Sequence, residues 1–64
     1  MKFEYDPEAD AGYLQILDGT VTDTREIADN FYLDIDAEGR LLGIEILSMR
    51  AEGARLVKEE EVAV

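Results

Sequence analysis

The sequence predicts an α+β fold, in which an antiparallel β-meander of four to five strands carries one C-terminal helix packed on the sheet. Three observations lead to this prediction. Short segments alternate apolar and polar residues, a pattern typical of half-buried strands. Glycine, asparagine and aspartate separate these segments and favour tight turns. After Ser48, apolar residues recur at the wider spacing of a helix.

The first two strands are expected on either side of the only proline. Residues 2–5 read KFEY and place Phe3 and Tyr5 on one face. Residues 11–17 read AGYLQIL and alternate in the same way. The dipeptide Asp18-Gly19 follows, and such a turn between apolar flanks predicts a hairpin to the next strand.

Three further strands are expected at residues 21–28, 31–36 and 41–47. The first of them is the most polar and suits an edge of the sheet. The last carries aliphatic residues on both faces, which favours a central position. Asp29-Asn30 and residues 37–40 are expected to form the intervening turns, with Gly39 available for a positive φ.

The helix is expected to begin at Ser48, whose hydroxyl can cap the first turn. Three apolar residues then fall on one helical face: Met49, Leu56 and Val57. Gly53 weakens the helix interior, and the helix is expected to end around Lys58–Glu61. The sequence therefore predicts one small domain, residues 1–57, followed by an acidic and apolar tail at residues 58–64.

Ten apolar side chains are expected to form the core, because they share the inward face of the predicted strands. They are Phe3, Tyr5, Leu14, Ile16, Phe31, Leu33, Ile35, Leu42, Ile44 and Ile46. A chain of 64 residues buries only about 60% of its unfolded surface. Chains this short usually need a disulfide, a metal or a partner subunit. Since there is no cysteine and no histidine, a homodimer or larger homo-oligomer is expected, formed through an edge strand, the helix or both.

The chain has 16 acidic and 6 basic residues, a formal net charge of −10. Nucleic acids are bound through lysine and arginine, so neither a nucleic-acid partner nor an anionic membrane is expected. The charge serves either solubility or attraction to a basic partner protein, and both alternatives stay open. No apolar run has transmembrane length, and the first residues contain no apolar stretch of signal-peptide length. A cytoplasmic location is expected.

Four carboxylates surround Pro7: Glu4, Asp6, Glu8 and Asp10. They could form a metal site, a catalytic cluster or a solvated turn. A turn is expected, because the residue before a proline is extended and Asp6 can then accept backbone N–H groups of the turn that follows. Asp10 is expected to end that turn. Asp6 and Asp10 therefore have a structural role that requires no metal.

A second acidic stretch follows the spacing of an EF-hand calcium loop. Its residues at pattern positions 1, 3, 5, 6 and 12 are Asp34, Asp36, Glu38, Gly39 and Glu45. The flanking segments have strand patterns, so a hairpin is expected instead, with Asp34 paired near Leu42. Glu45 is then expected near Phe31. About 10 Å of strand separates Asp34 from Glu45 in this register, too far to share an ion. No metal or cofactor site is expected.

Catalysis by a single chain is not expected either. The sequence lacks histidine and cysteine, and its only serine, Ser48, stands at a helix start rather than beside a base. A domain this small has little interior for a catalytic cleft. The tyrosines Tyr5, Tyr13 and Tyr32 are expected to pack on the sheet, with their hydroxyls at its rim.

The segments YDPEADAGYLQIL and TREIADNFYLDIDAEGRLLGIEIL, followed by a helix beginning at Ser48, resemble a bacterial and archaeal family, domain-of-unknown-function family 2283. The resemblance covers roughly residues 3–56. Gly12 stands where the family more often has a larger residue, and the tail after Leu56 is this protein's own. Members often appear beside genes that resemble mRNA-cleaving toxins, so the resemblance implies an antitoxin-like role.

The residues and the resemblance together predict a non-enzymatic protein-interaction module that neutralises a basic, toxin-like partner. Two alternatives stay open. One is a structural homo-oligomer with no client. The other is a carboxylate-based or metal-dependent enzyme with a site at a subunit interface, where Asp6, Glu8 and Asp10 of one chain would face acids such as Asp34 of another.

Overall fold

The computed structural model describes residues 1–53. Several expectations lie outside the described residues: the helical positions Leu56 and Val57, the helix end around Lys58–Glu61, and the tail at residues 58–64. Within residues 1–53, no helix has the length and apolar character needed to span a membrane.

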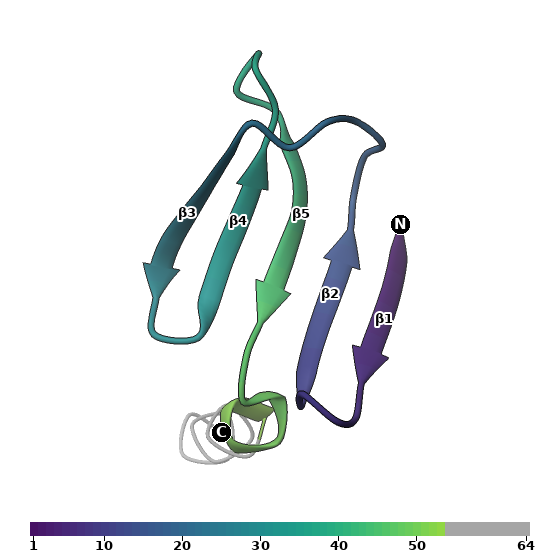
Figure 1. Cartoon of the computed structure of the whole chain (residues 1–64), viewed down its shortest axis with the longest axis vertical. Helices are drawn as coiled ribbons and strands as arrows, with labels where there is room; N and C mark the ends of the chain where they lie inside the picture. The colour runs from purple at the N-terminus through teal and green to yellow at the C-terminus, as the bar shows by residue number, and fades with distance from the viewer. Residues whose placement is uncertain (54–64) are drawn as a thin grey trace, which may run out of the picture.

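Five strands form one antiparallel sheet in the order β1-β2-β5-β4-β3 (Figure 1). They are β1 (Lys2–Asp6), β2 (Ala11–Gln15), β3 (Asp23–Ala28), β4 (Phe31–Ile35) and β5 (Leu41–Ile46). A short helix at residues 49–53 follows β5. The predicted α+β class, with one antiparallel sheet and a C-terminal helix, is confirmed.

The strand order departs from a simple meander at one connection. β1 and β2 form a hairpin, and β3, β4 and β5 form a three-stranded meander, but β2 pairs with β5. Strands β2 to β5 thus have the Greek-key arrangement, in which a long connection joins the two outer strands. The prediction of a hairpin at Asp18-Gly19 is wrong, because β2 and β3 are not neighbours in the sheet. The largely aliphatic β5 occupies the centre and the polar β3 an edge, as their compositions predict.

The connection from β2 to β3 runs past the ends of β5 and β4. The N–H of Ile16 donates to the carbonyl of Leu42 at 2.8 Å. Farther along, the N–H of Thr22 donates to the carbonyl of Ile35 at 2.9 Å. Between these points Gly19 lies against Leu42, because a Cβ at Gly19 would be 2.9 Å from Leu42 Cδ2. Among residues 1–53, Leu42 is the only buried hydrophobic side chain, with 2% exposed.

The register places most of the expected core on one face of the sheet. Two rows of residues share that face, one formed by Phe3, Leu14, Ile44 and Leu33 and the next by Tyr5, Ile46 and Phe31. We call these seven residues the apolar face. Phe3 is 49% exposed and Tyr5 39%, and the other five are half-buried. The shared face is confirmed, but the described chain does not bury it.

Positive backbone φ angles mark the turns. Gly39 has φ +82° in the β4–β5 turn, as predicted, and Asn30 has φ 70° in the predicted turn between β3 and β4. Asparagine tolerates this left-handed conformation better than other non-glycine residues. These two turns fix the hairpins that flank β4.

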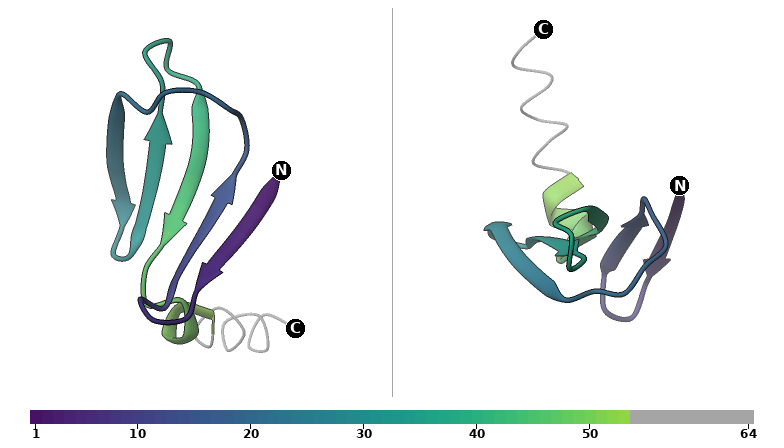
Figure 2. Two further views of the ribbon diagram at one scale, coloured as in Figure 1. Left: turned by 45° about the vertical axis from the view of Figure 1, so that its right-hand side comes forward. Right: turned by 90° about the horizontal axis from the view of Figure 1, so that it is seen from above.

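The helix begins at one end of the sheet, on the side of the apolar face (Figure 2). The sulfur of Met49 occupies the place where a Cβ of Gly12 would lie, and the ring of Phe3 approaches the same point to within 2.9 Å. The absence of a side chain at Gly12 therefore lets the helix pack on β1 and β2. The predicted contact between helix and sheet is confirmed at this end of the sheet.

The helix start predicted at Ser48 is also confirmed, because the Ser48 carbonyl accepts the N–H of Glu52 at 3.0 Å. The carboxylate that accepts a free N–H group of the first helical turn belongs to Asp10, in the turn between β1 and β2. The N–H of Arg50 donates to both carboxylate oxygens of Asp10 at 3.3 Å. The helix cap is therefore supplied by the β1–β2 turn.

Candidate functional site

The face of the sheet opposite the apolar face carries alternating acids and tyrosines. The register aligns one such residue from each strand, from one edge to the other: Glu4, Tyr13, Glu45, Tyr32 and Glu26. Adjacent strands lie about 4.8 Å apart, so these five residues extend over roughly 19 Å. We call them the Glu–Tyr row, and the face that carries them the polar face.

Tyr13 lies over Gly43, the buried glycine of the central strand β5. A Cβ on Gly43 would meet the hydroxyl of Tyr13 and would also be 2.9 Å from the carbonyl oxygen of Leu14. Burial, followed by the negative charge of Asp34, raises the pKa of Tyr13. The hydroxyl of Tyr13 is therefore neutral at physiological pH, and the ring is held against the backbone of the sheet.

Tyr32 is fixed by the edge strand beside it. Its hydroxyl donates to Oε2 of Glu26 at 2.9 Å, and this hydrogen bond raises the pKa of Tyr32. At the opposite edge, Lys2 forms an ion pair with Glu4 at 2.9 Å. Both side chains are exposed, and exposed ion pairs contribute little to folding stability. The charge of the row thus comes from its carboxylates, with a neutral ring between each pair.

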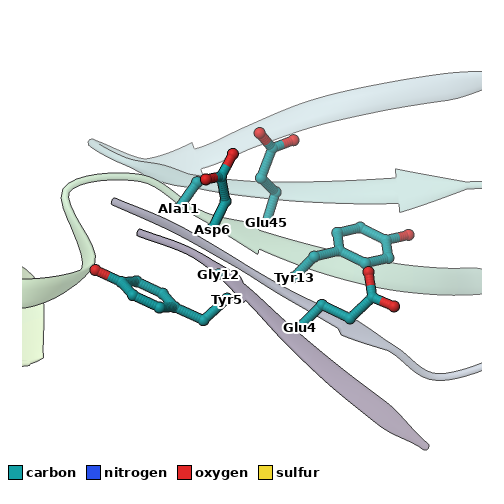
Figure 3. A pocket seen from close by; sticks show the side chains of 7 residues that line it. All are labelled: Glu4, Tyr5, Asp6, Ala11, Gly12, Tyr13 and Glu45. Carbon is teal, nitrogen blue, oxygen red and sulfur yellow. The ribbon is translucent and has the colours of Figure 1, made fainter. Parts of the chain in front are cut away.

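An open pocket of about 300 Å³ lies on the polar face, where β1, β2 and β5 run side by side (Figure 3). It is lined by Glu4, Tyr5, Asp6, Ala11, Gly12, Tyr13 and Glu45. Figure 3 shows the carboxylates of Glu4, Asp6 and Glu45 on the same side of the sheet as the ring of Tyr13. The side chain of Tyr5 points to the other side. The pocket therefore offers three carboxylates and one aromatic ring.

This combination has the chemistry of a site for an organic cation. A guanidinium or ammonium group can pair with carboxylates and also lie against the face of a tyrosine ring. Among residues 1–53, no group of three or more aspartates and glutamates has the arrangement of a metal site. With its three carboxylates and the ring of Tyr13, the pocket has the chemistry to pair with a lysine or arginine side chain.

The first acidic stretch forms the predicted turn. Oδ1 of Asp6 accepts the backbone N–H groups of Glu8 at 3.0 Å and Ala9 at 3.5 Å, which confirms the predicted role of Asp6. Asp10 ends the turn with φ 51°. Its carboxylate accepts the hydroxyl of Tyr5 at 2.5 Å, and this hydrogen bond lowers the pKa of Asp10.

The stretch with EF-hand spacing is a β-hairpin, as predicted. The observed register pairs Asp34 with Gly43 and Glu45 with Tyr32, each one residue from the predicted partner. An irregularity of the register next to Asp34 accounts for the difference. Asp34 accepts the hydroxyl of Thr24 on β3 at 2.8 Å, so it joins two strands of the polar face.

Asp36 is the buried acid of this hairpin, with 9% exposed. Its Oδ1 accepts the N–H groups of Glu38 and Arg40, each at 2.9 Å, and its Oδ2 accepts Nε of Arg40 at 2.8 Å. The backbone hydrogen bond from Arg40 is the main cause of the lowered pKa of Asp36. The carboxylate therefore closes the β4–β5 turn.

The Glu–Tyr row was not predicted. The sequence predicts that Tyr13 and Tyr32 pack on a sheet, but a meander places β3, not β5, between their two strands. Only the pairing of β5 with both β2 and β4 brings Glu45 between the two rings. The available signal was the aliphatic character of β5 on both faces, which indicated its central position without indicating its neighbours.

Comparison with known proteins gives one result. A family described as a protein of unknown function, DUF2283, matches residues 2–50 of the chain. A search of curated proteins and a search of solved structures each found no significant match. The matched region contains all five strands, the Glu–Tyr row and the start of the helix. The chain therefore belongs to the DUF2283 family of proteins of unknown function.

Proposed function

We propose that this protein is an interaction module whose polar face binds a basic segment of a partner protein. The observation that supports the proposal is the Glu–Tyr row, which crosses all five strands and alternates carboxylates with aromatic rings. A surface that served solubility alone would need carboxylates but not this alternation with rings.

The spacing of the row suits several basic side chains at once. Carboxylates on alternate strands lie about 10 Å apart, with a ring midway between them. An arginine bound between a carboxylate and a ring gains both an ion pair and a cation–π contact, the latter worth about 0.5–2 kcal/mol. A segment with several arginines or lysines would therefore bind far better than a single basic residue.

The pocket beside β1 gives the row an anchoring position. Its volume of about 300 Å³ is at the lower limit for small-molecule sites and suits one long side chain. Glu4, Asp6 and Glu45 surround this volume, and Tyr13 provides its ring. One lysine or arginine of the partner occupies this pocket, and its neighbours lie along the row.

The net charge of −10 acts on a basic partner before the two proteins touch. It attracts a basic partner over about a Debye length, roughly 8–10 Å at physiological salt, and raises the association rate. In an antitoxin-like role, the bound module covers the basic surface through which a toxin-like ribonuclease would bind RNA. The module in this way neutralises the partner without any catalytic step.

A binding titration with a defined probe tests the proposal. Calorimetry with hexa-arginine should give binding that weakens about tenfold in Tyr13→Leu and in Tyr32→Leu, which keep the net charge but lose a ring. Glu45→Gln should weaken binding more than Glu8→Gln, because both remove one charge but only Glu45 lies in the row. Equal effects of the two glutamine variants, with none from the leucine variants, would show attraction by net charge alone and refute the proposal.

The neutraliser role needs a second experiment with the natural partner. Affinity purification from the source cell should be run with the native chain and with Tyr13→Leu as matched baits, followed by mass spectrometry. A basic ribonuclease-like polypeptide retained by the native bait and lost by the variant is the expected result. Its absence in repeated trials, or equal retention by both baits, would contradict the antitoxin-like role.

A further inference from the structure

The apolar face is left open across its middle by the described part of the chain. Four residues cross the sheet there: Phe3, Leu14, Ile44 and Leu33. The helix at residues 49–53 contacts the sheet at Gly12, and Glu52 accepts the side-chain amide of Asn30 in the β3–β4 turn at 3.1 Å, so the helix covers one end of this face. Among residues 1–53, no large side chain is fully buried. A second layer is therefore needed to remove these side chains from water.

We propose that a second copy of this chain provides that layer, so that two sheets pack face to face as a β-sandwich. A sheet with one apolar face is stable when another layer packs on it, and stacked sheets lie about 10 Å apart with interdigitating side chains. This inference goes beyond the proposed function, which concerns the opposite face of the sheet. Either can fail without the other.

The distribution of charge favours a second copy as the occupant. The carboxylates of the Glu–Tyr row lie on the polar face, so two apolar faces can meet without bringing those acids together. The charged residue in line with the central apolar row is Arg25, which pairs with Leu33 in the register. Arg25 forms an ion pair with Asp23 of its own strand at 3.0 Å. Arg25 and Asp23 neutralise each other at the edge strand, so the rows of the apolar face offer little charge to a strongly charged partner.

The size of the face requires a dimer to use all of it. Four strand spacings of about 4.8 Å and five residues of about 3.3 Å give roughly 320 Å² in flat projection. The accessible area of the protruding side chains is larger than this projection. Specific interfaces bury about 600–1,000 Å² on each partner, so the whole face must be used. An isologous dimer, in which both copies use the same surface, meets this requirement.

The helix restricts how the two copies can be arranged. Because it lies at one end of the apolar face, a two-fold axis parallel to the strands would bring both helices to the same end (Figure 2). A two-fold axis across the strands places them at opposite ends. The central row of one copy then meets the same row of the other. Both Glu–Tyr rows face outward in this dimer, on opposite sides.

Sedimentation equilibrium of the full chain between about 5 and 500 µM tests the dimer, with the range set around a micromolar dissociation constant. The expected mass is twice 7.2 kDa, and 7.2 kDa at every concentration would overturn the proposal. Phe3→Glu, at an exposed edge-strand position, should raise the dissociation constant roughly 100-fold. Ala37→Glu adds the same charge at an exposed turn and should leave the dimer intact. Equal effects of both variants would also overturn it.

Two further measurements keep the test decisive if Phe3→Glu does not fold. In the native chain, methyl NMR signals of Leu14 and Ile44 should shift with concentration, and unchanged signals would contradict a dimer through this face. The double variant Leu56→Asp/Val57→Asp, made in the full chain, separates the sheet from the C-terminal residues as the interface. Loss of the dimer in that variant, with its retention in Phe3→Glu, would refute the sandwich.

Discussion

Asp10 accepts the backbone N–H of Arg50, forty positions farther along the chain, with each carboxylate oxygen 3.3 Å from the nitrogen. The same carboxylate accepts the hydroxyl of Tyr5 at 2.5 Å. One side chain at the β1–β2 turn therefore fixes both the first strand and the start of the helix. The carbonyl of Asp10 adds a third contact, since it accepts the N–H of Met49 at 2.9 Å.

Replacing Asp10 with asparagine should lower the melting temperature and loosen the helix. Asparagine tolerates the φ of 51° at this position, so the loss reports on the carboxylate rather than on the backbone. The hydrogen bond to Asp10 is the main cause of the raised pKa of Tyr5, so that pKa should fall toward its ordinary value. Circular dichroism and ultraviolet titration of the tyrosines measure the two effects. Glu8→Gln, which changes an exposed acid of the same turn, should leave both unchanged.

The pH dependence of stability should carry the signature of Asp36. Its pKa in the folded state lies below the ordinary value of 3.8, so the unfolded state binds the proton first as pH falls. The contribution of Asp36 is therefore complete above pH 3.8 and is lost as pH falls below it through the folded value.

Asp36→Asn should accordingly melt at a lower temperature than the native chain at pH 6, and the difference should shrink below pH 3.8. Thermal melts from pH 2.5 to 7 measure this. Asp29→Asn, at an exposed turn position, is the matched control and should follow the native curve. A difference between Asp36→Asn and the native chain that stays constant with pH would contradict the role of the charge.

Gly43→Ala should destabilise the sheet by about 1–3 kcal/mol, because the new methyl group meets the Tyr13 hydroxyl and the Leu14 carbonyl. Displacing Tyr13 from its half-buried position should also bring its raised pKa down. Urea unfolding and tyrosine titration give the two readouts. Gly53→Ala has no atom within 4 Å of the added carbon and should not be destabilising. Similar losses in both variants would show that crowding at Gly43 is not the cause.

Gly12→Ala should destabilise by a similar 1–3 kcal/mol, since the added methyl group takes the place of the Met49 sulfur and approaches the Phe3 ring. Met49→Ala vacates that place. The double variant Gly12→Ala/Met49→Ala should therefore lose less stability than the sum of the single variants, with a coupling of about 0.5–3 kcal/mol. Additive losses in urea unfolding would mean that the helix does not pack on Gly12.

Local patterns predicted the elements of this fold well. Alternating residues located all five strands, and Asn30 and Gly39 marked the turns that their φ angles confirm. Asp6 before Pro7 predicted a capped turn, and the observed hydrogen bonds agree. Each of these features depends on neighbours in the chain, which is why a single sequence was enough to find them.

The arrangement of the elements depends on contacts that no local pattern encodes. Asp18-Gly19 has the chemistry of a hairpin turn, but the burial of β5 between β2 and β4 outweighs that preference. The Glu–Tyr row follows from this pairing, so it was missed for the same reason. Asp10 was expected to end a turn, and its link to Arg50 across forty residues has no signature in the local sequence.

The place of β5 at the centre of the sheet has a consequence for how the molecule is made. The β1–β2 hairpin and the β3–β4 hairpin are synthesised first, and neither pairs with the other in the finished sheet. Of the five strands in residues 1–53, Leu41–Ile46 is synthesised last, and it alone joins the two hairpins. An isolated two-stranded hairpin is only marginally stable in water, so the sheet should become stable only once Leu41–Ile46 pairs with both hairpins.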